Sequence, residues 1–467
     1  MFRGETGDDI GGKRKGRKPM HWNINSPLHV CVADEGFSFD ELVTKLDEVF
    51  KKKGFPELIR LIMMLVDEVL RVLVMKREPL PAKASCGCDQ PSPVLDGCKE
   101  RKIHTRLGQV EFPCITRAKC RNCGRIWLPL LEFCGLRPGQ RHSDELEKLA
   151  LETCAKETYR DAAGRLRDSP GVHLHHTTYR RWVLKTKAGE IATPAIGEEE
   201  GPWTLWADGT TYKGVDESGH AEAGDLKTLF GIAADGSLQR LGVWTGGKSW
   251  ADIRSELAEK SIQFPDGSLL ISDAEPGLVT GLEGCADDQQ RCHWHTVRDL
   301  YHAMHKDGAS APEIKPVQKR LKTLLAVELP QEDFDEVPPE KKAAIRRRME
   351  TAEEGVDRLV AELETGGYPK AAAYLKRGKH ALFAYVRRWL ALGMVSPRAS
   401  SFIERVMRAL GKRIKKIGYN WKAEGALKMA RIVLKLFASD SEWKAYWKHR
   451  MGETSRVVIL FRPLQVT

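Results

Sequence analysis

The chain has 467 residues, 42% of them hydrophobic, which is enough to bury more than one core and suggests roughly two to four domains. Its most apolar run, residues 58–75, contains four charged residues, which excludes a membrane-spanning helix there. Residues 1–20 are polar and lack the apolar segment of a signal peptide, so we expect a cytoplasmic protein.

Positive charge is unevenly distributed along the chain. Lysine and arginine total 75 against 64 acidic residues, which gives a net charge of +11. Residues 371–450 alone contain 19 basic and four acidic residues, a surplus that exceeds the net charge of the whole chain. Such a concentration indicates a surface that binds a phosphate backbone, so a nucleic acid is the expected partner.

The chain begins with a basic, glycine-rich tail, residues 1–22, which we expect to be disordered. Residues 23–84 form a predicted helical N-terminal segment, because apolar residues recur at helical spacing in two runs joined near residues 54–56. This segment is a candidate for pairing two copies of the chain.

Seven of the eleven cysteines lie between residues 86 and 134. In a reducing compartment we do not expect disulfides, so metal binding is the leading explanation. Cys120 and Cys123 have the spacing of a zinc knuckle, and Cys86 and Cys88 are their natural complement. We therefore predict a zinc-ribbon-like module over residues 85–137 that holds one structural zinc ion.

Two alternatives remain for the cysteines. The thiols could all be small buried apolar groups without metal. One zinc ligand could also come from another nearby residue: Cys98, Cys114, Cys134 or His104.

Residues 138–191 contain three helical runs, at 144–154, 159–168 and 177–187, with Gly171 before the last. The pattern resembles a helix-turn-helix module whose last helix enters the major groove of DNA, and a plain helical bundle is the alternative. The predicted DNA contacts on the last helix are Thr177, Thr178, Arg180 and Arg181.

A mixed pattern of strands and helices begins at Trp203. Strands are predicted at 203–207, 227–233 and 238–244, the last two joined by a turn at Asp235 and Gly236. A helix capped by Ser249, a strand at 268–272, a strand at 290–293 and a helix at 294–305 follow. This is the order of a ribonuclease H-like fold, if a further helix fits within residues 277–287.

The predicted fold class is therefore multidomain α/β. Residues 197–305 form the first part of a ribonuclease H-like mixed sheet, and residues 306–400 form an all-helical insertion. Residues 401–450 complete the core, and residues 451–467 form a C-terminal tail. The zinc-ribbon-like and helix-turn-helix modules precede this core.

Asp208 and Asp273 each follow an apolar run and are placed at the ends of the first and fourth predicted strands. These strands are neighbours in a ribonuclease H-like sheet, so the carboxylates should meet where a divalent cation stabilises them. Glu404 lies among apolar residues of a later helix and is the third expected ligand. The same helix and its continuation present basic residues for DNA backbone binding: Arg405, Arg408, Lys412, Lys415 and Lys416.

The alternative is that both aspartates are ordinary turn residues and that Glu404 pairs with Arg408 one helical turn later. Their joint occurrence in fold order favours a metal site. Glu275, two residues after Asp273, is a competing candidate for the second ligand.

Four segments, residues 206–210, 271–273, 292–295 and 401–405, resemble prokaryotic insertion-sequence transposases of the Mutator-like DDE group. In that group a Cys-x-x-His pair follows the second aspartate, and a helical insertion precedes the glutamate. Cys292 and His295 match this pair as auxiliary site residues, although core packing would explain them equally well. The resemblance spans about residues 100–435.

The resemblance implies a nucleoid-associated transposase that binds terminal inverted repeats, cleaves double-stranded DNA and joins the 3′ ends to target DNA. Asp208, Asp273 and Glu404 would be catalytic and hold two Mg²⁺ or Mn²⁺ ions. A homodimer or higher assembly on DNA is expected. The alternatives are a ribonuclease H-like nuclease without strand transfer, and a non-catalytic zinc and helix-turn-helix regulator.

Overall fold

The structure is a computed structural model that describes residues 39–168, 171–191, 196, 201–273, 275–399, 401–417, 420–438 and 440–451. The predicted tail at 1–22 and residues 452–467 of the predicted C-terminal tail lie outside these ranges. Within them, no helix is both long and apolar enough to cross a membrane.

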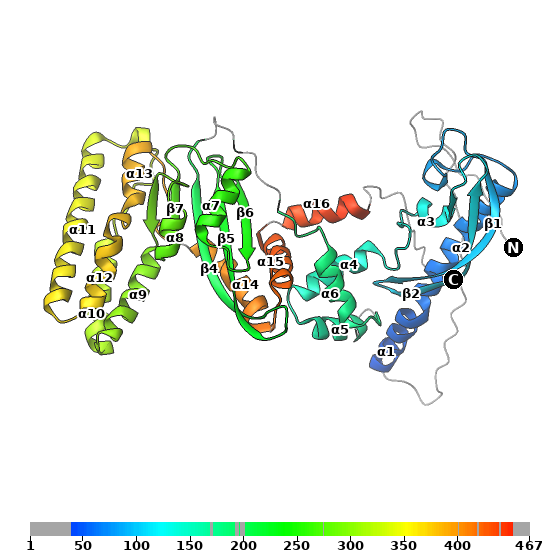
Figure 1. The fold of residues 1–467 in the computed structure, drawn as a ribbon, viewed down its shortest axis with the longest axis horizontal. Helices are drawn as coiled ribbons and strands as arrows, with labels where there is room; N and C mark the ends of the chain where they lie inside the picture. Colours follow the sequence, from blue (N-terminus) through cyan, green and yellow to red (C-terminus); the bar gives the residue numbers. More distant parts are fainter. Residues whose placement is uncertain are drawn as a thin grey trace.

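A five-stranded mixed sheet lies at the centre of the molecule (Figure 1). Its strands are β4 Thr204–Val215, β5 Ala221–Ile232, β6 Leu238–Thr245, β7 Leu269–Ser272 and β8 Asp288–Arg291. The strand order is β6-β5-β4-β7-β8, in which β4, β5 and β6 are antiparallel and β7 and β8 run parallel to β4. Strands and helices therefore follow the predicted order.

Helices cover both faces of this sheet. Successive side chains of a strand point to opposite faces. Leu205 and Ala207 of β4 pack in a core with α7 and α8, whereas Trp206 packs on the other face with α14 and α15. These helices are α7 Trp250–Glu259, α8 Pro276–Gly281, α14 Ser401–Gly411 and α15 Ala423–Ala438.

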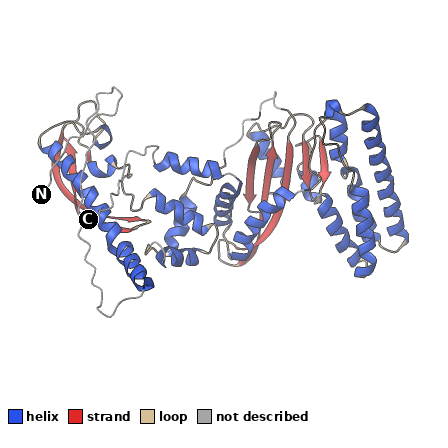
Figure 2. Cartoon of the chain, turned by 180° about the vertical axis from the view of Figure 1, so that it is seen from behind, coloured by secondary structure: helices blue, strands red, loops and turns tan. Residues whose placement is uncertain are grey.

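A helical unit with its own apolar core lies at one end of the sheet (Figure 2). Its helices are α9 His293–Lys306, α10 Ala311–Leu325, α11 Pro339–Thr365, α12 Pro369–Gly378 and α13 Ala384–Leu392, with short 3₁₀ turns at Phe334–Glu336 and Lys379–Ala381. Buried Arg388 of α13 attaches this unit to β4, because its guanidinium donates to the Trp203 carbonyl (3.1 Å) and the Thr204 hydroxyl (2.8 Å).

Three helices lie on the other side of the sheet: α4 Asp144–Cys154, α5 Tyr159–Asp168 and α6 His176–Lys185. They share one apolar core with α14, α15 and α16 (Asp440–Met451). Arg413, in the π-helical segment Lys412–Ile417, is 2% exposed and donates from Nε to the Cys154 carbonyl (2.5 Å). This hydrogen bond therefore links the three helices to the π-helical segment that follows α14.

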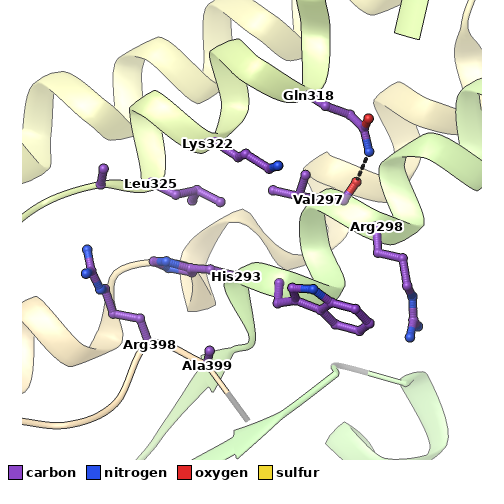
Figure 3. A pocket seen from close by; sticks show the side chains of 10 residues that line it. His293, Val297, Arg298, Gln318, Lys322, Leu325, Arg398 and Ala399 are labelled. Atoms are coloured by element: carbon purple, nitrogen blue, oxygen red, sulfur yellow. Dashed lines mark hydrogen bonds between the residues drawn. The ribbon is translucent and has the colours of Figure 1, made fainter. Parts of the chain in front are cut away.

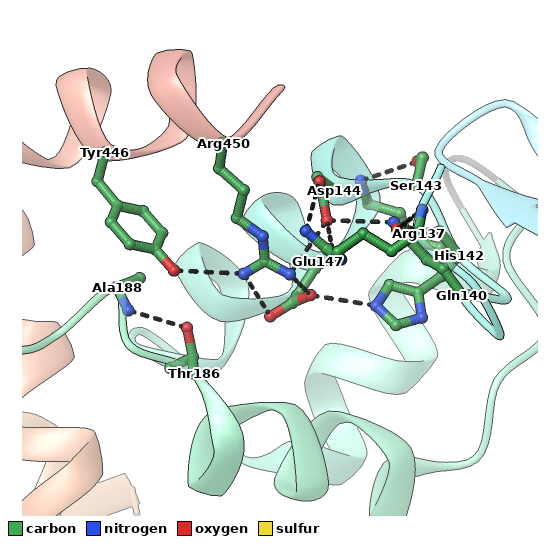
Figure 4. A network of polar contacts seen from close by, with 11 residues as sticks. Arg137, Gln140, His142, Ser143, Asp144, Glu147, Thr186, Ala188, Tyr446 and Arg450 are labelled. Atoms are coloured by element: carbon green, nitrogen blue, oxygen red, sulfur yellow. Dashed lines mark hydrogen bonds and ion pairs between the residues drawn. The ribbon is translucent and has the colours of Figure 1, made fainter. Parts of the chain in front are cut away.

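A polar network joins the C-terminal helix α16 to α4 (Figure 4). The Arg450 guanidinium of α16 pairs with the Glu147 carboxylate (2.6 Å) and with Asp144 (3.0 Å). His142 contacts the same Glu147 carboxylate through Nε2 at 3.1 Å. Because Glu147 and Asp144 are at most 9% exposed, these ion pairs are shielded from solvent.

The N-terminal region holds a second sheet, of β1 Pro93–Thr105, β2 Gly108–Cys120 and β3 Ile126–Trp127, all antiparallel. Its helices are α1 Phe39–Val49, α2 Phe55–Met75 and α3 Pro129–Phe133, with a 3₁₀ turn at Ala82–Ala84. The prediction of two helices joined near residues 54–56 is corrected, because a π-helical segment, Phe50–Gly54, makes α1 and α2 continuous. Pro56 lies directly after this π-helical segment, in the first turn of α2.

Cys98 and Cys114 form a disulfide between β1 and β2. This corrects the expectation that the chain has no disulfides. The antiparallel pairing of the two strands brings the two Cα atoms to 5.3 Å, a separation that a disulfide spans.

Candidate functional site

The register of two parallel strands brings Asp208 and Asp273 together. Trp206 of β4 pairs with Ile271 of β7, and each aspartate lies two residues further along its strand direction. Trp206 and Ile271 face the same core, so by alternation both carboxylates lie on the face covered by α14. The aspartates are therefore neighbours on one face of the sheet.

The prediction that Asp208 ends its strand is wrong. β4 continues to Val215 because it pairs with β5 along its whole length, from Thr204–Ile232 to Val215–Ala221. The apolar run ends at Ala207, and the pairing of β7 with β4 ends at Trp206. Beyond that point the α14-facing side of β4 can carry a polar side chain.

Glu404 approaches the aspartates from α14. Its neighbours Ile403 and Val406 are fully buried in the core, and Glu404 itself is half-buried. The pKa of Asp208 is raised to about 7, mainly by burial and also by the negative charges of Asp273 and Glu404, while the Gly209 amide and His295 lower it. The charges of Asp273 and Glu404 therefore both act on Asp208, although the ligand atoms of the three carboxylates do not all lie within 4.8 Å of one another. We call these three residues the carboxylate cluster.

Cys292 and His295 lie beside this cluster. Cys292 follows β8, where its amide donates to the Ser272 carbonyl (2.8 Å), and His295 is in the first turn of α9. The ligand atoms of Cys292, His295 and Glu404 all lie within 4.8 Å of one another. Burial lowers the pKa of His295, but a hydrogen bond with Cys292 and the charges of Cys292 and Asp273 outweigh it and raise the pKa.

Glu275 differs from Asp273 in its surroundings. Its side chain is exposed, and its backbone amide donates to Asp273 Oδ1 (3.0 Å).

The donor atoms of the site indicate which metals it could hold. Oxygen ligands from the carboxylate cluster suit Mg²⁺ or Mn²⁺, while the adjacent Cys292 thiol and His295 imidazole are donors that softer metals prefer.

The four cysteines predicted to bind zinc lie together in the N-terminal sheet. Their sulfur atoms are all within 4.8 Å of one another, with 3.3 Å between Cys86 and Cys88 and 3.8 Å between Cys88 and Cys120. Backbone amides of Cys123 and Ser92 lower the pKa of Cys120 to about 6. We call this group the thiol cluster.

None of the alternative zinc ligands joins the thiol cluster among the described residues. Cys98 and Cys114 are bonded to each other, and the Cys134 thiol contacts the Met63 sulfur at 3.6 Å. His104 likewise falls outside the group.

The predicted DNA contacts of α6 lie mostly at its surface. Thr177, Arg180 and Arg181 are exposed and Thr178 is half-buried, while the opposite face of the helix is buried. The predicted backbone contacts Arg405, Arg408, Lys412, Lys415 and Lys416 are all exposed. Part of the basic surplus of residues 371–450 is instead buried, namely Arg388, Arg413 and Lys435.

A mixed α/β protein with clustered carboxylates and exposed basic helices has the features of an enzyme that acts on nucleic acid. The sequence model of the family described as "Transposase, Mutator family" matches residues 199–445, more than half of the chain. The chain therefore belongs to the Mutator family of transposases. No curated protein sequence matches it significantly.

Sequence reasoning did not single out Trp294 and Arg298, which lie next to His295 in α9. The Trp294 ring contacts the His295 ring, with 4.9 Å between the ring centroids. The negative charge of Asp273 raises the pKa of Arg298. The signal in the sequence that could have identified these residues was the tryptophan inside the Cys-x-x-His segment.

Proposed function

We propose that this protein binds the terminal inverted repeats of its own insertion sequence, cleaves the DNA there and joins the freed 3′ ends to target DNA. Asp208, Asp273 and Glu404 would hold two Mg²⁺ or Mn²⁺ ions, which would supply Lewis-acid stabilisation of the attacking and leaving oxygens. The chain's own contribution is to fix three oxygen donors on a rigid sheet and helix. No protein nucleophile takes part.

The observation that carries this proposal is the strand register that places Asp208 and Asp273 on neighbouring strands, on the face covered by the helix of Glu404. Both Asp273 and Glu404 raise the pKa of Asp208. Grouping like charges is unfavourable unless a cation neutralises them. Three carboxylates from distant elements therefore support a metal site, in a chain whose family acts on DNA.

We propose that the central sheet with α14 is a ribonuclease H-like core. The support is the order β6-β5-β4-β7-β8, in which three antiparallel strands are followed by two parallel ones. β4 and β7 are neighbours and carry the two aspartates. Helices α10 to α13 would be the insertion between the Cys-x-x-His segment and the glutamate helix.

We propose that the thiol cluster binds one structural zinc ion. Zinc–sulfur bonds of about 2.3 Å in a tetrahedron separate the sulfurs by about 3.8 Å. The Cys88–Cys120 separation is 3.8 Å, which supports this ligand set. Cys86 and Cys120 are buried and Cys123 is exposed, so the site would close one side of the small N-terminal sheet.

We propose that α4, α5 and α6 form the helix-turn-helix module that recognises the DNA ends through α6. The exposed residues of α14 and the segment after it would bind phosphates without regard to sequence. This division is supported by the exposure of Arg180 and Arg181 on α6 and of Lys412 and Lys415 after α14.

We propose that two copies of the chain pair through α2. Leu58 and Leu61 are 42% and 41% exposed, although the helix buries its opposite face against β2. Apolar residues also recur at coiled-coil spacing along α2, at Leu58, Ile62, Leu65, Val69 and Val72. Leu58→Asp should then lower the mass measured by light scattering to that of a monomer, and an unchanged mass would exclude α2 as the interface.

The test of the proposed function uses the full chain, Mg²⁺, a labelled duplex carrying the repeat that flanks its gene, and a supercoiled plasmid. We expect cleavage at the repeat end and a labelled product joined to the plasmid. Cleavage without joining would indicate a nuclease that lacks strand transfer. Specific binding with neither reaction would indicate a DNA-binding regulator.

A further inference from the structure

Trp294 differs from the other tryptophans of the chain in its exposure. Trp22 lies outside the described residues, and ten of the remaining eleven tryptophans are at most 8% exposed, whereas Trp294 is 52% exposed. An indole contributes a large apolar area when it is covered. A half-exposed indole on a well-formed helix therefore indicates a surface that a ligand covers.

Trp294 lines a pocket of about 460 Å³ between α9, α10 and residues 398–399 (Figure 3). This volume lies within the range of small-molecule sites, roughly 300–1,000 Å³. Val297 and Leu325 give the pocket apolar walls, and three cations, Arg298, Lys322 and Arg398, line it as well. The Arg298 guanidinium lies 4.9 Å from the centre of the Trp294 ring.

This combination matches the chemistry of a nucleotide. Exposed aromatic rings and arginine planes stack on nucleobases of any sequence, while neighbouring cations bind the flanking phosphates. Arg298 and Arg398 currently pair with Asp299 (2.6 Å) and Glu328 (3.1 Å). These pairs are partly exposed and contribute little, so phosphates can replace the carboxylates.

The pocket is adjacent to the carboxylate cluster. The Trp294 ring meets the His295 ring edge to face, and a His295 ring nitrogen lies within 4.8 Å of a Glu404 carboxylate oxygen. Arg298 interacts electrostatically with Asp273. A DNA strand with one phosphate at the carboxylates would therefore place a neighbouring nucleotide at the pocket.

We propose that this pocket, which we call the base pocket, takes one unstacked nucleobase from a nucleotide next to the cleaved phosphate. The inference rests on the proposed function. A base in a duplex is stacked and cannot enter a pocket, so the nucleotide must rotate out of the helix. Stacking on Trp294 compensates for the lost stacking in DNA and fixes the strand at the carboxylates.

A crosslinking experiment identifies the occupant. Duplexes of the terminal repeat carry 5-iodouracil at one position each, scanning both strands near the cleavage site, and are bound to the full chain with Ca²⁺ in place of Mg²⁺. Ultraviolet light joins this base to an aromatic ring on which it stacks. We expect one position to crosslink to Trp294, as mapped by mass spectrometry. Crosslinks confined to other residues would overturn the proposal.

Cleavage kinetics test the role of the ring. Trp294→Ala should slow cleavage about ten- to a hundredfold, the scale of one lost base–aromatic stack. Trp294→Phe should restore most of the rate. The matched control is Phe437→Ala, which truncates an aromatic side chain that is 46% exposed on α15 and should cleave like the wild type.

An abasic nucleotide at the crosslinked position distinguishes base binding from a structural role. It removes the cost of unstacking, so it should raise the cleavage rate of Trp294→Ala toward that of the wild type. If Trp294→Ala cleaves normally, or no abasic position raises its rate, the base pocket is wrong. If the wild type cleaves no repeat DNA, the proposed function itself fails, and the base pocket fails with it.

Discussion

The carboxylate cluster and the thiol cluster differ in the size of the apolar core that holds their residues in place. Asp208, Asp273 and Glu404 come from two strands and a helix whose positions are fixed by large apolar cores on both faces of the sheet. The thiol cluster lies in a core of only Cys86, Ala118, Cys120 and Trp127. The central sheet therefore has large apolar cores beside its candidate site, whereas the thiol cluster has only a small core of its own next to the main core of the N-terminal sheet.

This difference predicts different roles for the metals. At the carboxylate cluster the fold holds like charges near one another, so a bound cation would lower the energy of that arrangement and would be available for chemistry. At the thiol cluster a bound zinc ion would supply folding energy. Removing a ligand should therefore abolish activity at the first site and local structure at the second.

The largest expected effect is on catalysis. Asp208→Asn, Asp273→Asn and Glu404→Gln should each slow Mg²⁺-dependent cleavage about a thousandfold or more, because each removes an anionic ligand worth several kcal/mol in the transition state. Thermal unfolding without metal should be unchanged or shifted upward, because repulsion is relieved. Cleavage of a labelled element end and calorimetry measure the two quantities.

Glu275→Gln is the matched control for these variants. It removes a carboxylate two residues from Asp273 whose side chain is exposed, so cleavage should remain near that of the wild type. Normal cleavage by Glu404→Gln would mean that another residue supplies the third ligand.

The next largest effect is expected at the thiol cluster. Elemental analysis should find about one zinc per chain, and Cys120→Ser should lose it and expose residues 85–137 to proteolysis, because structural zinc stabilises small modules by several kcal/mol. Cys134→Ser, which changes a thiol outside the cluster, should retain the zinc. A zinc-free preparation that resists proteolysis would contradict a structural role for zinc.

A smaller effect is expected at the residues proposed to bind DNA, on α6 and in the segment after α14. Arg180→Ala and Arg181→Ala should each reduce the preference for repeat ends over random DNA by about 1–3 kcal/mol. Replacing Lys412, Lys415 and Lys416 by glutamine should instead weaken binding to all DNA and flatten its salt dependence. Equal losses on both DNAs from the arginine changes would exclude α6 as the recognition helix.

An effect of similar size, on stability rather than on DNA binding, is expected at the network that joins α16 to α4. Burial raises the pKa of Glu147, but hydrogen bonds and ion pairs with His142 and Arg450 outweigh it, so the pKa lies below its usual value of 4.5. The stabilisation is therefore complete above pH 4.5 and is lost as the pH falls through the lower, folded-state pKa. Glu147→Gln should cost about 1–3 kcal/mol at pH 7 and much less near pH 3.

Glu145→Gln on the same helix is the control, because its partner Arg106 and Glu145 itself are about half exposed. Denaturant unfolding of both variants at the two pH values measures the difference. If the stability lost in Glu147→Gln does not decrease at low pH, the charge of Glu147 is not the cause of that loss.

Local sequence signals predicted the order of elements well. Alternating and helical apolar patterns gave the strands and helices from Trp203 to Lys306, and Ser249 caps α7 as predicted, with its hydroxyl accepting from the Asp252 amide (3.1 Å). These features depend on residues close in sequence. The misplaced strand end at Asp208 arose because pairing with β5 does not require apolar side chains.

The sequence by itself determined the chemistry that is available: three carboxylates in fold order, a Cys-x-x-Cys knuckle with a complementary Cys-x-Cys pair, and a basic C-terminal region. The tertiary structure alone decided which side chains meet. It placed His295 beside Glu404, paired Cys98 with Cys114, buried Arg413 and left Trp294 exposed. The reason is that strand register and helix packing bring together residues far apart in the chain, and no local pattern encodes those distances.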